Sequence, residues 1–448
     1  MKAADFGEQF TWGVASAAFQ VEGAWNAADK ASSVWDEVAH RGRMEGGPVS
    51  DDAIDFYHRY AEDIALIASL GFNANRLSLS WPRLLGDGAG PPNQAGIDFY
   101  NRVIDCCLEH GLQPWLTLFH WDLPLELYRK GGFANRAIVD LFADYAGVCA
   151  RAFGDRVKHW MVFNEPNSVA GHLLIGVHER WGFHLRKTLR SVHHMNLSIA
   201  AAARRLRQEL PAAARIGTTL ATMPMHPFDP VDRWRQRAQD AYDALFHRIF
   251  ADPLGGLGYP WDATPLLRFL RPAVADGDYD QLPFRFDFLG IQYYSPIHIR
   301  RAPIPGLWGV PSFWINDAKP VVRCEVGWYA HPPGFMRVLE RYAMHPIADR
   351  LVITENGIGV HDDLQDGRVH DEIRIWYYRK HLEIVLAAIC KGLPIDGYFC
   401  WSYADNIEWL FGRRPRLGLV YIDYENGLRR YLKDSALWFR DLLSVRQR

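Results

Sequence analysis

The chain has 448 residues, of which 49% are apolar and 13% aromatic, so it can bury a large core. Its formal net charge is −2 and its Lys/Arg clusters are short, which excludes nucleic acid as an expected partner. No apolar stretch reaches the length of a membrane span, and the first ten residues lack the apolar core of a signal peptide. We therefore expect a soluble cytoplasmic protein with no membrane partner, and homo-oligomer formation stays open.

Short apolar segments alternate with helical patterns along the chain. The predicted strands cover residues 11–19, 75–80, 114–120, 158–164, 215–222, 286–294, 351–355 and 396–402. The predicted helices cover residues 55–70, 96–110, 136–153, 189–209, 233–250, 333–343 and 372–391.

This alternation is typical of a parallel sheet, and eight such units close into a barrel. We predict fold class α/β, with a single (β/α)8 TIM barrel forming one catalytic domain over residues 1–448. The longer irregular stretches are predicted as elaborated βα loops over the C-terminal face of the barrel. They cover residues 24–50, 223–233, 300–323 and 403–417.

The six cysteines show no Cys-x-x-Cys spacing, which is typical of reduced thiols in a reducing compartment. We expect all of them to be buried. No HxH pair or HExxH motif lies at a predicted strand end, and no GxGxxG follows a strand, so neither a metal nor a dinucleotide cofactor is expected.

Polar residues gather where the predicted strands end, which is where the active site of such a barrel forms. Glu165 and Glu355 follow apolar runs directly, in the segments MVFNEP and LVITENG. A carboxylate at such a point is costly to desolvate unless it is partnered or used. The fifth strand contributes nothing evident. The other candidates at strand ends and in the last loop are Gln20, Arg76, His120, Trp121, Asn164, Gln292, Tyr294, Trp401, Glu408 and Trp409.

Two carboxyl groups are what glycosidic bond cleavage needs, one to protonate the leaving oxygen and one to attack the anomeric carbon or activate water. Glu165 lies in a Trp/Phe-rich region, which favours a protonated acid. Arg76 and Tyr294 come from other strands and would keep Glu355 ionised. We therefore predict Glu165 as the acid/base and Glu355 as the nucleophile, supported by Arg76 and Tyr294.

The remaining candidates suit the binding of sugar hydroxyls and apolar sugar faces. Taken alone, His120 is equally consistent with a hydrogen-bonded core histidine, and Trp401 is better explained by core packing. Only the set as a whole favours a sugar site.

Several longer segments match one known family. They are FTWGVASAAFQVEGAW, NRLSLSWPRL, LTLFHWDLP, RVKHWMVFNEP, FLGIQYYS, LVITENG, GYFCWSYADNIEW and RLGLVYIDYENGLRRYLKDSALWF. On these segments the chain resembles glycoside hydrolase family 1, the β-glucosidase-like barrel enzymes, over nearly its whole length.

The resemblance implies a retaining, cofactor-free β-glycosidase that acts by double displacement through a covalent glycosyl-enzyme intermediate. The implied substrate is a small-molecule β-D-glucoside, with galactosides and fucosides left open. By motif, Glu165 is the acid/base and Glu355 the nucleophile. Glu408 matches the position that grips the 4- and 6-hydroxyls, where it would repel a phosphorylated sugar. Trp328, in VGWYAHPPG, resembles the aglycone-side tryptophan.

The resemblance also implies contacts with the sugar that is cleaved off, the glycone. Asn164 is expected at the 2-hydroxyl, where hydrogen bonds strengthen in the transition state. The other implied glycone contacts are Gln20, His120 and Trp121.

The chain departs from the family pattern at three positions. Gln292 stands where the family usually has Asn, which would shift or remove a contact in the site. Leu417 replaces an aromatic residue and would loosen the wall near the 6-hydroxyl. Asn167 replaces a large aromatic residue, which puts the aglycone platform in doubt. A lesser change is NRLSLS in the second strand, where YRFSIS is common. We expect activity with an altered substrate preference.

Two alternatives share the fold. A transglycosidase would form the same intermediate and pass the sugar to an acceptor other than water. A catalytically weak sugar-binding barrel would lack Glu165 or Glu355, and both are present.

Overall fold

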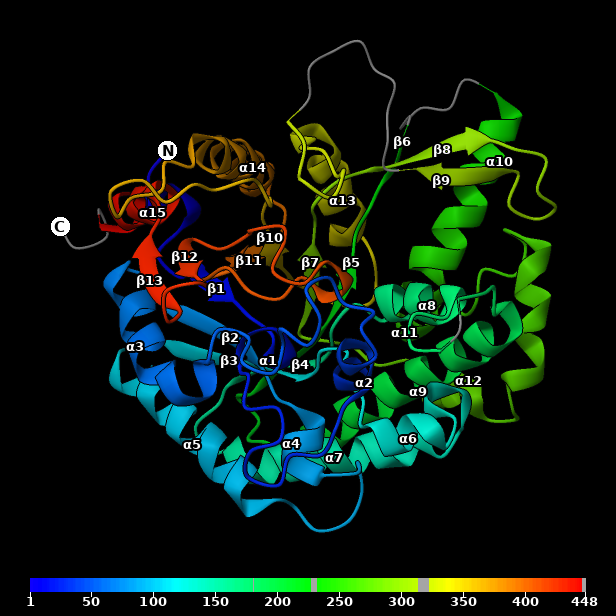
Figure 1. The fold of residues 1–448 in the computed structure, drawn as a ribbon. Helices are drawn as coiled ribbons and strands as arrows, with labels where there is room; N and C mark the ends of the chain where they lie inside the picture. Colours follow the sequence, from blue (N-terminus) through cyan, green and yellow to red (C-terminus); the bar gives the residue numbers. More distant parts are fainter. Residues whose placement is uncertain (180, 227–231, 313–321, 445–448) are drawn as a thin grey trace.

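The computed structural model describes residues 1–179, 181–226, 232–312 and 322–444. Eight parallel strands form a closed barrel, with β1 paired to β2 on one side and to β11 on the other (Figure 1). The predicted (β/α)8 fold is confirmed. The barrel strands are β1 (Thr11–Ala15), β2 (Ala74–Ser78), β3 (Gln113–Phe119), β4 (His159–Phe163), β5 (Arg215–Ala221), β7 (Phe288–Gln292), β10 (Leu351–Asn356) and β11 (Ile395–Trp401).

The first strand is shorter than predicted. The expected strand over residues 11–19 is wrong beyond Ala15, because a short helix, α1 (Ala18–Val21), begins there. The hydroxyl of Ser78 accepts a hydrogen bond from the Ala18 N–H at 2.7 Å and so fixes the first turn of this helix. An apolar run alone does not distinguish a buried strand from a buried helical turn.

Amphipathic helices surround the barrel and bury their apolar faces against it. In α7 (Ile138–Phe153), for example, Phe142, Tyr145 and Phe153 are fully buried. The predicted helix over residues 233–250 continues to residue 254 in three parts: α10 (Arg233–Asp243), the π-helical turn η3 (Ala244–Arg248) and α11 (Ile249–Leu254). The other large helices are α3 (Phe56–Ser69), α5 (Gln94–Glu109), α7 (Ile138–Phe153), α9 (Leu185–Glu209), α13 (Pro332–Ala343) and α14 (Glu372–Cys390).

Further elements lie in the stretches between the predicted ones. A three-stranded sheet, β6 (Met225–His226), β8 (Ile297–Arg301) and β9 (Gly309–Ser312), stands beside α10 (Figure 1). A hairpin, β12 (Val420–Asp423) and β13 (Arg429–Leu432), precedes α15 (Asp434–Ser444). Parts of the predicted loops 223–233 and 300–323 lie outside the described residues. The remaining elements are η1 (Ala3–Phe6), α2 (Val34–His40), α4 (Trp81–Leu85), α6 (Leu125–Arg129), η2 (Gly132–Ala134), α8 (Pro166–Ile175), η4 (Pro265–Phe269), η5 (Arg271–Ala273), α12 (Asp278–Gln281) and η6 (Trp409–Phe411).

All six cysteines are free thiols. Five are buried as predicted, but the prediction is wrong for Cys390, which is exposed at the last residue of α14 where the helix meets solvent. Among the described helices, none combines the length and apolarity that a membrane crossing requires.

Candidate active site

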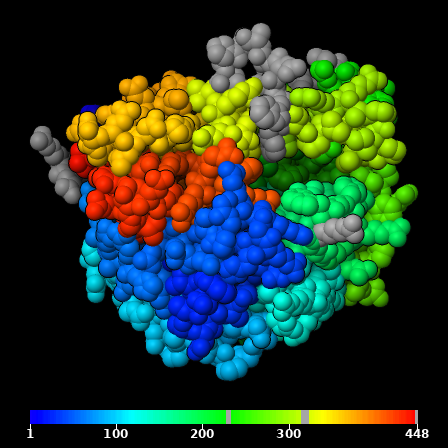
Figure 2. All heavy atoms as spheres, viewed as in Figure 1, coloured from blue at the N-terminus to red at the C-terminus, as the bar shows by residue number. Residues whose placement is uncertain are grey.

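A cavity of about 680 Å³ opens at the C-terminal ends of the barrel strands. On the face seen in Figure 2, a hollow lies between the green segment of α8 and the yellow-green segment around β8. Glu165 and Glu355 both line the cavity. The other predicted residues in its wall are His120, Trp121, Asn164, Gln292, Tyr294, Trp328, Trp401, Glu408 and Trp409.

Glu355, near the end of β10, is held by three donors. Arg76 and Gln292 donate to its Oε1 at 2.6 and 2.7 Å, and the Tyr294 hydroxyl donates to its Oε2 at 2.7 Å. Arg76 is fully buried and lies behind the cavity wall. A carboxylate that accepts this many hydrogen bonds, one from a guanidinium group, is fixed in position and favoured as the anion.

The two residues after Glu355 explain why its motif reads Glu-Asn-Gly. The Asn356 amide donates to the Tyr293 carbonyl and to the Tyr377 hydroxyl, which ties the strand end to its neighbours. A Cβ at Gly357 would lie 1.9 Å from the carbonyl oxygen of Trp401. Only glycine lets β10 and β11 approach this closely at the site.

Glu165 follows β4 and precedes α8. Its φ of 45° lies in the left-handed region, which is costly for a residue with a side chain and is typical of functional positions. Its backbone N–H donates to the Thr219 hydroxyl at 3.2 Å, and its Oε2 accepts from the Ser168 hydroxyl at 2.8 Å. The carboxyl group is therefore oriented by neutral partners alone.

The two glutamates have different electrostatic surroundings. Burial, together with the nearby charge of Glu355, raises the pKa of Glu165 to about 8. Burial also raises the pKa of Glu355, but the charge of Arg76 and the hydrogen bonds from Tyr294 and Arg76 oppose that rise. The surroundings of Glu355 therefore favour the anion, whereas those of Glu165 favour the protonated acid.

Asn164 connects the two glutamates. Its side-chain oxygen accepts from Arg76, from Gln292 at 2.7 Å and from the Thr219 hydroxyl at 3.1 Å. Its side-chain nitrogen lies 3.0 Å from Nε2 of His120, so His120 accepts there and carries its proton on Nδ1. Burial holds the pKa of His120 well below its usual range and keeps the ring neutral.

Aromatic rings cover the same end of the cavity. The rings of Trp121 and Trp409 lie 4.4 Å apart, and His120 stacks on Trp401 at 5.8 Å. The indole N–H of Trp121 donates to the Asn164 carbonyl at 2.9 Å, so this tryptophan offers its ring rather than its N–H. Trp328 packs against Tyr294 at 5.3 Å.

Gln20 lies behind the cavity wall, where it is fully buried. Its amide donates to the Ile407 carbonyl at 2.6 Å and to the Asn406 side chain at 3.2 Å. Gln20 therefore holds the segment that leads into Glu408. Burial and the charge of Glu355 raise the pKa of Glu408 to about 8.

Four buried polar atoms at this end have no protein partner among the described residues. They are the Nδ1 of His120, the Oε1 of Gln20, the Oε1 of Gln292 and the Oε2 of Glu408. Because buried polar groups are almost always paired, such atoms mark a place where a polar ligand or ordered water completes the hydrogen bonding.

The structure shows the contacts of the three residues that depart from the family pattern, Gln292, Asn167 and Leu417. The amide nitrogen of Gln292 donates to both Asn164 and Glu355, whereas its Oε1 has no partner among the described residues. Asn167 exchanges two hydrogen bonds with the backbone of Ala221 and so fastens α8 to the end of β5. Leu417 is buried in an apolar cluster with Trp401 and lies behind the cavity wall.

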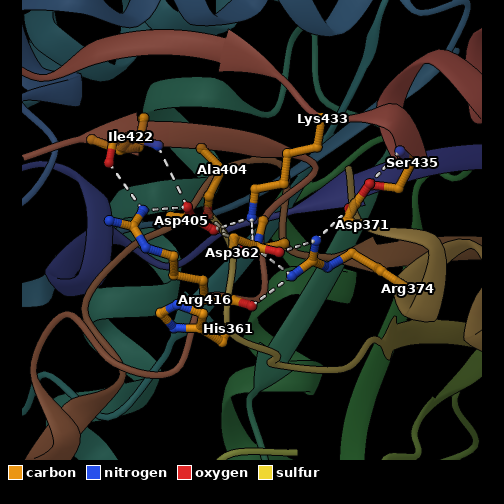
Figure 3. Close-up of polar contacts among 12 residues, drawn as sticks. His361, Asp362, Asp371, Arg374, Ala404, Asp405, Arg416, Ile422, Lys433 and Ser435 are labelled. Carbon is orange, nitrogen blue, oxygen red and sulfur yellow. Dashed lines mark hydrogen bonds and ion pairs between the residues drawn. The ribbon is translucent and has the colours of Figure 1, made fainter. Parts of the chain in front are cut away.

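A buried charge network holds the loops that follow β10 and β11 (Figure 3). Lys433 donates to Asp362 at 2.5 Å and to Asp405 at 2.6 Å, and Arg374 contacts Asp362 at 2.8 Å. Arg416 joins the network through Asp405 at 2.6 Å. Asp405 lies between Trp401 and Glu408 in sequence, so the network fixes one wall of the cavity.

Sequence reasoning missed two groups of residues. Thr219, on the fifth strand, and Ser168, in α8, orient Asn164 and Glu165. The polar run Thr218-Thr219 inside an apolar strand was the available signal. The apolar residues that line most of the cavity gave no such signal in the sequence, because they come from many separate elements.

Among the described residues, no group of three or more His, Cys, Asp or Glu side chains is arranged to hold a metal ion.

The chain is similar to known proteins over nearly its whole length. The model of Glycosyl hydrolase family 1 matches residues 2–448. A 1,4-beta-D-glucan glucohydrolase from Thermotoga neapolitana is 36% identical, over 98% of each chain. A bifunctional beta-D-glucosidase/beta-D-fucosidase from Bifidobacterium breve is 35% identical, also over 98% of each chain. The structure of a family 1 β-glucosidase from Thermotoga maritima superposes with a TM-score of 0.90, 35% identity and 98% coverage of both chains.

Proposed function

The chain belongs to glycosyl hydrolase family 1 and is a glycoside hydrolase, and from this premise we propose that it is a retaining β-glucosidase. The observation that carries the proposal is that two glutamates with different hydrogen-bond partners line one cavity. Glu355 is stabilised as an anion by Arg76 and Tyr294, whereas Glu165 keeps its proton. A nucleophile and an acid on the same substrate are what double displacement needs.

In the first step, Glu355 attacks the anomeric carbon while Glu165 gives its proton to the leaving oxygen. The bond to the aglycone breaks, and a covalent glycosyl-enzyme forms. Glu165, now ionised, takes a proton from water, which attacks the same carbon and releases the sugar. Forming the ester removes the negative charge of Glu355, which lowers the pKa of Glu165 at the moment when it must act as a base.

The sugar would be held by the buried polar atoms without protein partners. His120 Nδ1–H is a donor, and the free oxygens of Gln292 and Glu408 are acceptors, a mixture that suits several hydroxyls. The second amide hydrogen of Asn164 would donate to the oxygen of the 2-hydroxyl. Gln20 supports Glu408 through the chain at residues 406–407 and presents an unpaired oxygen of its own. The B. breve relative extends the proposal to β-D-fucosides as secondary substrates.

The Glu355→Gly variant tests the proposal. It should lose hydrolysis of p-nitrophenyl β-D-glucoside, and added azide should restore turnover and yield the α-glucosyl azide, because azide enters from the face that the carboxylate used. Near-normal hydrolysis by the variant, or a β-glucosyl azide product, would refute the nucleophile assignment. Product analysis of the wild type with added alcohols separates hydrolysis from transglycosylation.

A further inference from the structure

Most of the cavity wall is apolar and lies outside the glycone end. We define the apolar chamber by Leu174, Leu189, Val192, Met223, Phe246 and Val326, all of which line the same cavity as the two glutamates. They come from α8, α9, the segment after β5, η3 and the segment before α13. The chamber is therefore continuous with the place where the leaving group of a glycoside must lie.

The π-helical turn η3 contributes to the chamber. Leu245 and Phe246, within η3, both line the cavity. Such turns insert one extra residue in a helix and are frequent at functional sites, because they redirect side chains. Here η3 lies between α10 and α11, at the point where this continuous helical segment passes the cavity.

Polar groups in the chamber wall are already used inside the protein. Asn167 is paired with the backbone of Ala221, and the Tyr242 hydroxyl donates to the Gly309 carbonyl at 3.1 Å. Ser168 donates to Glu165, and the Ser295 hydroxyl donates to the Pro296 carbonyl at 3.0 Å.

Little polar capacity is left for a ligand in the described part of the wall. What is left is the Thr188 hydroxyl, which has no protein partner, and the His172 ring, which burial keeps neutral by lowering its pKa to about 4 and which offers one donor and one acceptor. A second sugar in the chamber would lose water from several hydroxyls and regain few hydrogen bonds, which is unfavourable. An apolar group would gain from leaving water.

The mouth of the cavity is apolar as well. Ile175, Phe183 and Phe411 line it and keep 45%, 67% and 42% of their surface exposed. Large exposed apolar side chains that gather at the rim of a cavity are typical of a binding surface. A long apolar substrate would continue from the chamber over this rim.

We propose that the chamber binds a large apolar aglycone, so that the preferred substrates are β-glucosides of long aliphatic or polycyclic alcohols rather than β-linked oligosaccharides. This inference rests on the proposed function. The proposed substrate preference differs from that of the T. neapolitana relative, whose name describes action on a 1,4-β-D-glucan.

A series of alkyl β-D-glucosides from methyl to octyl tests the proposal, because the reactivity of the leaving alcohol changes little along it. The value of kcat/KM should rise with each methylene, by at most about fourfold per step if burial is complete. The octyl compound should exceed the butyl compound by about tenfold or more. Ether-containing glucosides of the same length, and cellobiose, should both lie well below the octyl compound.

Variants of similar side-chain size test whether the rise of kcat/KM with alkyl length comes from the apolar chamber. Val192→Thr and Met223→Gln place a polar group in the chamber at nearly constant size, and the octyl-to-methyl ratio of kcat/KM should fall at least about threefold in each. Met344→Gln is the control, since Met344 is 83% exposed and lies outside the cavity wall; its ratio should stay unchanged. A flat alkyl series, or faster cleavage of cellobiose, from an enzyme active on p-nitrophenyl β-D-glucoside would overturn this inference alone. An enzyme inactive on every glucoside would overturn the proposed function as well.

Discussion

The side-chain amide of Gln292 donates a hydrogen bond to Oε1 of Glu355 at 2.7 Å. The same nitrogen lies 2.7 Å from Oδ1 of Asn164, so one amide group orients both the proposed nucleophile and the proposed contact to the 2-hydroxyl. We propose that Gln292 serves in place of the asparagine that the family resemblance leads one to expect at this position. The extra methylene is accommodated because the amide reaches from the end of β7 across to β10 and β4.

Replacing Gln292 by Leu should lower kcat/KM for p-nitrophenyl β-D-glucoside by about ten- to a hundredfold. Leucine removes both donors at similar size, and a hydrogen bond to a charged group contributes about 1.5–3 kcal/mol. Steady-state kinetics would measure the loss. Gln281→Leu is the control, since Gln281 is exposed on α12, and it should leave the kinetics unchanged. Equal kinetics for the Gln292 variant and the wild type would show that Arg76 and Tyr294 alone hold Glu355.

The Glu165→Ala variant should distinguish substrates by their leaving groups. A substrate with a poor leaving group needs the proton of Glu165, whereas a dinitrophenyl glucoside departs without it. The value of kcat/KM should therefore fall by about a hundredfold or more for an alkyl glucoside and far less for the dinitrophenyl compound. An equal loss on both would contradict the acid role.

The pH dependence of kcat/KM should be bell-shaped. Activity needs Glu355 ionised and Glu165 protonated, so it falls at low pH as Glu355 gains its proton. It also falls as the pH rises through the pKa of Glu165, which is about 8. With an activated substrate, Glu165→Gln should lose the alkaline limb and keep the acidic one. An alkaline limb that survives in this variant would assign the titration to another group, such as Glu408.

Lys433→Met should lower the free energy of unfolding by more than the loss of an exposed ion pair does. The change leaves Asp362 and Asp405 buried without their shared cation, and breaking a buried pair costs about 3–5 kcal/mol. Urea denaturation followed by tryptophan fluorescence would measure the free energy of unfolding. Lys391→Met removes an exposed pair with Glu340, so it should cost less than about 1 kcal/mol. Similar losses for both variants would show that the network adds nothing beyond a surface pair.

Much of the barrel can be predicted from the sequence, because each strand is a short apolar run and most of the neighbouring helices have an apolar stripe. The residues at the strand ends follow from the same pattern. The helix α8 escapes prediction because Pro166 begins it directly after a glutamate with positive φ, and it has no clear apolar face. The sheet of β6, β8 and β9 is also missed, since its strands are short and β6 pairs with β8, which lies far along the chain.

Electrostatic differences within the site are predictable in direction only. The sequence places Arg76 and Tyr294 on strands near Glu355, but the barrel must close before their distances are known. Thr219 illustrates the limit: its hydroxyl meets Asn164 and the backbone of Glu165 only because β5 packs beside β4. Pairing between strands, rather than local sequence, makes it part of the site.

The pairing of β1 with β11 has a consequence for how the protein is made. The last strand of the barrel begins at Ile395, whereas its partner ends at Ala15, so the ribosome must synthesise most of the chain before the two can meet. At about 5–20 residues per second, the first strand leaves the ribosome roughly 20–80 s before its second neighbour exists. During that interval one edge of β1 is open, and nascent chains should depend on chaperones that shield such an edge until translation ends.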